Sequence, residues 1–131
     1  MMKIQGSAEN YLEGILMIKE RNGEVRSIDI VNELGFSKPS ISVAMKNLRN
    51  NGYITMDTKG FIDLTEKGMA IAETMYERHK LFTRWLVELG VNEKTAKEDA
   101  CRLEHVMSAE TFSAIKNFIY QHCNDNSSTT T

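Results

Sequence analysis

The chain has 131 residues, of which 41% are hydrophobic and 26% are charged, a composition that is typical of a small globular protein and excludes a disordered one. No apolar run approaches the ~20 residues that a membrane span needs, and the start lacks the apolar stretch of a signal peptide, so we expect a cytoplasmic protein without a membrane partner. Two cysteines are too few for a disulfide framework. The formal net charge of −2 argues against a protein that simply coats nucleic acid, but it leaves room for a local basic face.

The first part of the chain predicts three helices. Apolar residues recur at three- and four-residue spacings over residues 7–21, with Ser7 as the expected N-cap. A short helix follows over 27–34. The third helix should begin after Ser37, because a capping hydroxyl there precedes the only proline of the chain by two positions, and it should run to about residue 50.

The pattern changes from a helical period to a period of two over residues 53–64, and Thr58-Lys59-Gly60 supplies a turn in the middle. This pattern predicts a small β-hairpin. Three helices followed by a hairpin indicate a winged helix-turn-helix domain, which we place at residues 1–66.

The rest of the chain reads as helical. A helix over 65–89, with Thr65 as its expected cap, is too long for a three-helix domain to cover, so it should connect to a second helical domain over 67–123. Further helices are expected over 92–107 and from Ser108 onward, and the polar tail 124–131 should be disordered. The predicted fold class is therefore mainly α with a small β-hairpin.

Basic residues gather in the predicted third helix and hairpin. Four basic side chains face one acid between Ser37 and Lys59, in a chain that is negative overall. Lys and Arg there would contact DNA phosphates, and short polar side chains near the helix start could reach base edges in a major groove. The alternative is that this is a solvated face of a domain without a DNA role. The residues expected to contact double-stranded DNA are Ser37, Lys38, Pro39, Ser40, Ser42, Lys46, Arg49 and Lys59.

Cys101, Glu104 and His105 form the sharpest cluster of chemically reactive residues in the sequence. At helical spacings of three and four, a thiolate, a carboxylate and an imidazole would project from one face within reach of a single ion. The alternative is a structural one, because cysteine packs as a small hydrophobe and histidine often lies satisfied near a core.

Residues on two other predicted helices strengthen the metal hypothesis. His79 lies on the apolar stripe of the long helix, where an unpaired imidazole would be costly. Asn10 and Glu13 share one face of the first helix and could reach the same region. A mixed set of sulfur, nitrogen and oxygen ligands suits a divalent first-row transition metal and is wrong for calcium or magnesium.

Three segments resemble a known family. Residues 98–108, EDACRLEHVMS, look like the metal-site helix of the iron-dependent repressors of the diphtheria toxin repressor family. Residues 77–81, ERHKL, resemble the long-helix signature of that family, and residues 8–13 resemble the start of its first helix. The resemblance covers roughly residues 7–120 and leaves no sequence for the SH3-like domain of larger members, as in the manganese transport regulators. It implies a metal-activated, homodimeric repressor of metal homeostasis genes that binds operator DNA and is not an enzyme.

The resemblance also implies a ligand set and a metal. At position 101 the iron-responsive members have cysteine and the manganese-selective members a carboxylate, so Fe(II) is favoured here, with Mn(II) as the alternative. The family has Met or Asp where this chain has Asn10, whose side chain offers a neutral carbonyl oxygen or a hydrogen bond. The ligands of the second, ancillary site fall on Thr83 and Lys97, and a protonated lysine cannot ligate. Glu98, one position along, could substitute in part, or the site could follow the binuclear arrangement with Glu13. Carried over residue by residue, the ligands are Glu13, His79, Cys101, Glu104 and His105, with Asn10 completing the set.

Dimerisation is expected to use the last helices, where Phe112, Ile115, Phe118 and Ile119 exceed what one small domain can bury. Two other functions were weighed. One is a metalloenzyme, which the lack of a nucleophile triad or a phosphate loop disfavours. The other is a metal-independent winged-helix regulator that senses a small molecule or redox state through Cys101. We expect no small organic substrate.

Overall fold

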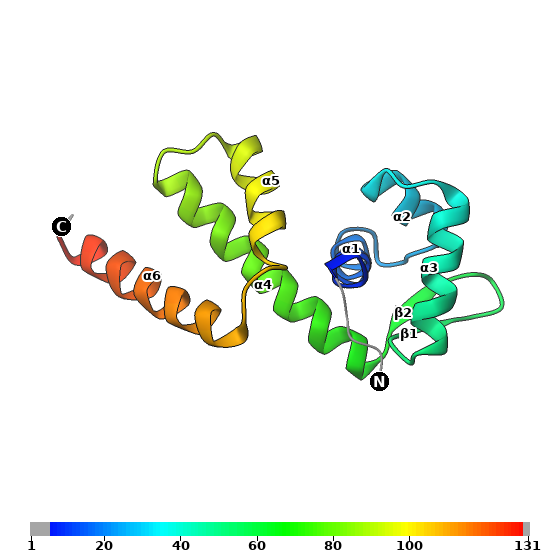
Figure 1. The fold of residues 1–131 in the computed structure, drawn as a ribbon. Coiled ribbons are helices and arrows are strands. Elements are labelled where there is room, and N and C mark those ends of the chain that lie inside the picture. Colours follow the sequence, from blue (N-terminus) through cyan, green and yellow to red (C-terminus); the bar gives the residue numbers. More distant parts are fainter. Residues whose placement is uncertain (1–5, 130–131) are drawn as a thin grey trace. The chain divides into compact units, whose positions relative to one another are not determined.

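A computed structural model describes the backbone of residues 6–129 and the side chains of residues 8–122 (Figure 1). The described residues form six helices and one two-stranded antiparallel sheet, which confirms the predicted fold class. The chain divides into two compact units, residues 1–76 and 77–131. No helix in the described part of the chain is both long enough and apolar enough to cross a membrane.

The first unit begins with three helices, α1 (Gly6–Asn22), α2 (Ser27–Leu34) and α3 (Lys38–Asn50). The predicted bounds of α2 and α3 are confirmed to within a residue. The predicted cap of α1 is wrong, because the helix already includes Gly6 and Ser7 lies inside it. The cap of α3 is as expected: the Ser37 side chain accepts a hydrogen bond from the Ser40 N–H at 3.3 Å.

The strands β1 (Ile54–Met56) and β2 (Ile62–Leu64) pair antiparallel and confirm the predicted hairpin. Asp57 shapes the turn between them, since its Oδ1 accepts hydrogen bonds from the N–H groups of Lys59 and Phe61, both at 2.9 Å. The hairpin is joined to the loop before α2 by the Ile62 N–H, which donates to the Val25 carbonyl at 2.7 Å. The wing is therefore fixed to the helical part of its own unit.

Helix α4 (Glu66–Glu88) starts in the first unit and ends in the second. As the sequence predicted, Thr65 caps it, with Oγ1 accepting from the Gly68 N–H at 3.2 Å and donating to the Gly52 carbonyl at 2.6 Å. Sterics require a glycine at position 68, because a Cβ there would lie 2.0 Å from the Tyr53 carbonyl oxygen. The first turn of α4 thus packs directly on the backbone that leads into the hairpin.

In the second unit, α5 (Glu93–Leu103) and α6 (Ala109–Thr129) pack with the last part of α4 around a small core. In Figure 1, α5 runs alongside that part of α4. The predicted helix over 92–107 is four residues too long, because α5 ends at Leu103 and residues 104–107 form a turn. Beyond the end of the helix, the Arg78 side chain on α4 donates hydrogen bonds to the carbonyl groups of Glu104 and Met107.

The structure differs from two expectations for the last helix, its dimer contacts and its end. Phe112 and Ile119, proposed as dimer contacts, are buried in the core of their own unit, whereas Phe118 is 51% exposed. The amphipathic spacing alone did not separate residues facing this core from residues facing outward. Helix α6 is assigned through Thr129, although the sequence predicted disorder from residue 124. Residues 130–131 and the side chains from 123 onward lie outside the described residues, so disorder of the tail stays a prediction.

Candidate metal centre and nucleic-acid interface

Three predicted ligands meet at the end of α5. One ligand atom from each of Cys101, Glu104 and His105 lies within 4.8 Å of the others. Cys101 is in the last turn of α5, and Glu104 follows as its C-cap with φ −63° and ψ −23°, which is still right-handed helical geometry. The helical spacing of the three side chains therefore continues past the end of the helix, and the predicted convergence is observed although the predicted helix was too long.

His79 joins this cluster from α4. Its Nδ1 lies 3.2 Å from Oε2 of Glu104, and Nε2 of His105 lies 3.3 Å from the other carboxylate oxygen, Oε1. The Glu104 side chain has no solvent exposure, while the two imidazoles are 20% and 13% exposed. Glu104 is thus held between two histidines from different parts of the second unit, a placement that sequence spacing did not reveal.

The chemistry of the cluster fits a divalent transition metal. A buried carboxylate is costly unless a positive partner offsets its charge. The buried Nδ1 of His79 makes no hydrogen bond and faces Glu104. This orientation suits a nitrogen that ligates a metal better than a nitrogen that is hydrogen-bonded to a backbone carbonyl. Thiolate, imidazole and carboxylate together match the ligand preferences of Fe(II), Mn(II), Co(II) or Zn(II) more closely than those of Ca²⁺ or Mg²⁺.

Arg78 supports this cluster and was missed by sequence analysis. It is 6% exposed, and its Nη1 donates to the carbonyl of Glu104 at 2.9 Å and to that of Met107 at 3.0 Å. The sequence signalled these contacts only through the position of Arg78 beside His79. Both partners are backbone carbonyls, which every residue type has, so no residue pattern could indicate them.

A second contact joins α4 to α6 in the same unit. Lys116 on α6 donates to Oε1 of Glu77 at 2.9 Å, and this hydrogen bond, with the attraction of the same carboxylate, raises the pKa of the Lys116 ammonium. The pair is exposed, so its contribution is to orientation more than to stability.

Asn10 and Glu13, the remaining predicted ligands, lie on α1 in the first unit. Glu13 is buried and Asn10 is half-buried. Burial of the Tyr76 hydroxyl, followed by the negative charges of Glu20 and Glu13, raises the pKa of Tyr76. This face of α1 is therefore acidic and partly desolvated within its own unit.

The residues of the predicted nucleic-acid interface are all exposed. Helix α3 buries Ile41, Met45 and Leu48, so its remaining residues point to solvent. The Ser37 hydroxyl also donates to Oγ of Ser40 at 2.9 Å, which fixes two of the short polar side chains at the helix start. The one acid of the segment, Asp57, is engaged in the wing turn. The exposed residues of this predicted interface are Ser37, Lys38, Pro39, Ser40, Ser42, Lys46, Arg49 and, in the wing, Lys59.

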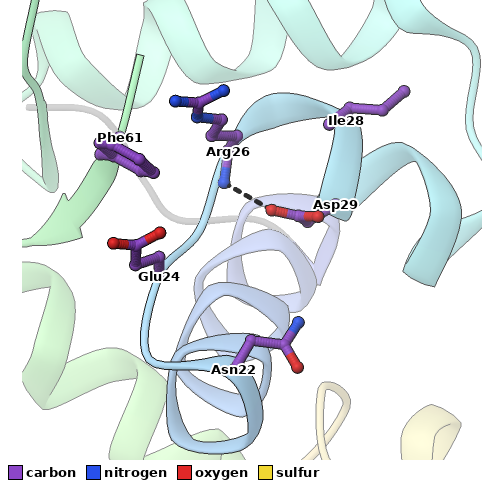
Figure 2. Close-up of a pocket in the computed structure, with 6 residues that line it drawn as sticks. All are labelled: Asn22, Glu24, Arg26, Ile28, Asp29 and Phe61. Carbon is purple, nitrogen blue, oxygen red and sulfur yellow. Dashed lines mark hydrogen bonds between the residues drawn. The ribbon is translucent and has the colours of Figure 1, made fainter. Parts of the chain in front are cut away.

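The first unit also carries a surface pocket of about 510 Å³ beside the wing (Figure 2). Figure 2 shows the Arg26 N–H donating to Asp29, at 2.9 Å, and the guanidinium of Arg26 lies 4.2 Å from the centre of the Phe61 ring. Small-molecule sites are usually lined by apolar and aromatic side chains. This pocket is lined mostly by polar and charged ones, so it gives no support to an organic effector. Its lining residues are Asn22, Glu24, Arg26, Ile28, Asp29 and Phe61.

A winged helix-turn-helix with an exposed basic third helix, together with a buried cluster of side chains suited to a divalent metal, is the architecture of a metal-dependent DNA-binding transcriptional regulator. Two family models match the chain: the iron-dependent repressor N-terminal DNA-binding domain over residues 3–60, and the iron-dependent repressor metal-binding and dimerisation domain over residues 65–127. The chain belongs to this family of iron- and manganese-dependent repressors.

Individual relatives agree with this assignment. The chain is 38% identical over 115 residues to an uncharacterised HTH-type transcriptional regulator of Methanocaldococcus jannaschii, covering 86% of this chain and 92% of that one. It is 34% identical over 114 residues to the transcriptional regulator MntR of Salmonella typhimurium, covering 87% and 73%. A solved manganese-dependent transcriptional repressor in complex with manganese has a TM-score of 0.76 at 28% identity, covering 84% of this chain and 51% of the other. The chain thus spans about half the length of that solved structure.

Proposed function

We propose that this chain is a homodimeric repressor that binds operator DNA when a divalent transition metal, Fe(II) in preference to Mn(II), occupies the cluster around Glu104. The observation that carries this proposal is the fully buried Glu104 carboxylate between His79 and His105, with Cys101 beside it. The ion would supply the positive charge that this desolvated acid needs. Cytoplasmic localisation is part of the proposal.

The ligands of the second unit would be His79, Cys101, Glu104 and His105. We propose that Glu13 on α1 completes the set and that Asn10 contributes its carbonyl oxygen. Glu13 and Asn10 belong to the first unit, so ligation by residues of both units would tie the DNA-binding unit to the dimerisation unit. With the ligands repelling one another in the metal-free protein, fewer molecules would hold both recognition helices at the spacing of two operator half-sites.

DNA recognition would use the exposed face of α3 and the wing. Lys38, Lys46, Arg49 and Lys59 would contact phosphates and set the register of the helix. The short side chains at the start of the helix, Ser37, Pro39, Ser40 and Ser42, would face the base edges, where a hydroxyl can donate or accept and a proline ring can contact a thymine methyl group.

The preference for Fe(II) rests on the thiol of Cys101, because a soft sulfur ligand disfavours Mn(II) relative to the metals that follow it. A Cys101→Asp variant would present the hard oxygen donor typical of manganese sites. We expect the ratio of Fe(II) to Mn(II) affinity to fall at least tenfold in this variant under anaerobic conditions. An unchanged ratio would show that position 101 does not set the metal preference.

The central experiment is an anaerobic titration. An operator duplex is first selected from random DNA in the presence of Mn(II), and binding is then measured by fluorescence anisotropy with Fe(II), with Mn(II) and with a chelator. We expect metal to tighten DNA binding by about 5- to 150-fold, the usual range of coupling between two sites. His105→Ala should remove this effect, while His122→Ala, outside the cluster, should retain it. Equal DNA affinity with metal and with chelator would refute the mechanism.

A further inference from the structure

Arg78 is a buried charged residue whose hydrogen-bond partners belong to the backbone. Its side chain is 6% exposed, and one nitrogen, Nη1, donates to two carbonyl oxygens, that of Glu104 at 2.9 Å and that of Met107 at 3.0 Å. Burying a guanidinium is costly unless it is well hydrogen-bonded, and these two hydrogen bonds offset part of that cost.

The two carbonyls mark the first and last residues of the turn that follows α5. Carbonyl groups at the end of a helix lack intrahelical partners and carry partial negative charge, which a cation stabilises. Arg78 therefore holds both ends of a four-residue segment, and that segment contains Glu104 and His105. The position of the two ligands depends on how this turn is fixed.

The same stretch of α4 also provides His79. While Arg78 binds the backbone carbonyl of Glu104, the next residue places Nδ1 3.2 Å from the side-chain carboxylate of Glu104. Consecutive helix residues point in directions about 100° apart, so one side chain can hold the turn while the other faces the ligand cluster. Two consecutive residues of α4 thus contact Glu104, Arg78 at its backbone carbonyl and His79 at its side-chain carboxylate, and together they fix the distance between the His79 ring and that carboxylate.

The guanidinium itself is held in place by α6. Its Cζ lies 4.9 Å from the centre of the Phe112 ring, and that ring packs edge-on against Phe82 with their centres 5.7 Å apart. A cation over an aromatic face is stabilised by the ring quadrupole. Arg78 is thus fixed between the turn and the core. A group that orients metal ligands must itself be held in place in this way.

We infer that Arg78 is a positioning residue of the candidate metal site: by holding the turn 104–107 against α4, it preorganises Glu104 and His105 toward His79 and so raises metal affinity without touching the ion. This inference rests on the proposed function. Residues behind metal ligands typically change metal affinity by about 10- to 100-fold when they are replaced.

The test compares Arg78→Met, which retains the apolar length but has no donor, with Arg78→Lys, which retains a charge and donors on a shorter side chain. Co(II) is the probe, because binding of the Cys101 thiolate to Co(II) produces a near-ultraviolet charge-transfer band. We expect Co(II) affinity to fall about 10- to 100-fold in Arg78→Met, with a weaker or shifted band, and to fall less in Arg78→Lys. Arg84→Met, an exposed arginine on the same helix, is the matched control and should bind Co(II) like the wild type.

Stability must be separated from positioning. Phe82→Leu weakens the same core without removing a donor to the turn, so the thermal midpoint of each metal-free variant is measured with its Co(II) affinity. If Phe82→Leu lowers affinity as much as Arg78→Met at equal loss of stability, or if Arg78→Met binds within twofold of wild type with the same spectrum, the inference is overturned. If Arg78→Met does not fold, an affinity of Arg78→Lys within twofold of wild type overturns it. Failure of the wild type to bind Co(II) would instead refute the proposed function.

Discussion

The carboxylate of Glu104 has no solvent exposure and lies 3.2 Å from Nδ1 of His79 on a different helix. A buried carboxylate is costly unless a positive partner offsets its charge, and in the proposed function a bound metal ion would be such a partner. If Glu104 is a ligand as proposed, the stability of the second unit should therefore depend on metal occupancy.

Replacing Glu104 by glutamine tests that connection. Glu104→Gln keeps the shape and removes the charge, so the metal-free variant should be as stable as the wild type or slightly more stable. The wild type should gain about 2.7 kcal/mol when Mn(II) is present at 100 times its dissociation constant. We expect most of that gain to be lost in the variant, as measured by thermal unfolding with and without Mn(II).

Glu110→Gln is the matched control, since Glu110 lies in the first turn of α6 and is exposed. It should show the full stabilisation by Mn(II). A Glu104→Gln variant that Mn(II) stabilises as strongly as the wild type would exclude Glu104 as a ligand.

Lys46→Ala tests the basic face of α3. Removal of one phosphate contact should weaken binding to all DNA sequences to a similar extent and reduce the slope of log affinity against log salt by about 0.9. The measurement is a salt titration of DNA binding in the presence of metal. Lys97→Ala, which removes an exposed lysine paired with Glu93 on α5, should leave the slope unchanged. Equal slopes for Lys46→Ala and the wild type would place the DNA contact elsewhere.

Gly68→Ala should destabilise the first unit. A Cβ at this position would lie 2.0 Å from the carbonyl oxygen of Tyr53, so the start of α4 must move away from the hairpin. We expect a loss of about 2 kcal/mol or more in the free energy of unfolding, measured by chemical denaturation followed by circular dichroism.

Gly14→Ala provides the contrast, because a Cβ there meets the Leu34 side chain at an ordinary 3.5 Å and alanine is the better helix former. This variant should be neutral or gain up to about 1 kcal/mol. If both alanine variants behaved alike, the close approach of Gly68 to Tyr53 would have no energetic weight.

The ion pair between Lys19 and Asp63 predicts a pH dependence. The hydrogen bond from Lys19 lowers the pKa of Asp63 below its usual 3.8, against the opposing effect of burial. A lowered pKa in the folded state adds stability at pH values above 3.8, and this contribution disappears as the pH falls through the lower folded value. Because both side chains are largely exposed, the pair should contribute no more than about 1 kcal/mol.

Asp63→Asn should therefore lower the melting temperature at pH 6 and match the wild type once the pH is below the lowered pKa of Asp63, where this carboxyl is protonated in both states. Lys19→Met should have a similar effect at pH 6, and the double variant should add little. A difference between Asp63→Asn and the wild type that stayed constant from pH 6 to below that pKa would show that the charge of Asp63 is not the cause.

Much of the architecture could be read from local patterns. The Ser37 cap before Pro39, the alternation after Tyr53 and the cap at Thr65 each act over a few residues, so they predicted α3, the hairpin and the start of α4. The convergence of Cys101, Glu104 and His105 was predictable for the same reason, because helical spacing places the three side chains on one face.

Features that join distant segments were not predictable in this way. The hydrogen bonds from Arg78 on α4 to the turn that follows α5 join distant segments, and the burial of Phe112 and Ile119 depends on how α6 packs against α4. Local periodicity predicts where each helix lies and which of its side chains share a face, because both follow from short-range hydrogen bonds and side-chain direction. The contact of His79 with Glu104 and the hydrogen bonds from Arg78 to the turn arise from packing between helices. Such contacts depend on burial and on backbone carbonyls, which local sequence patterns do not encode.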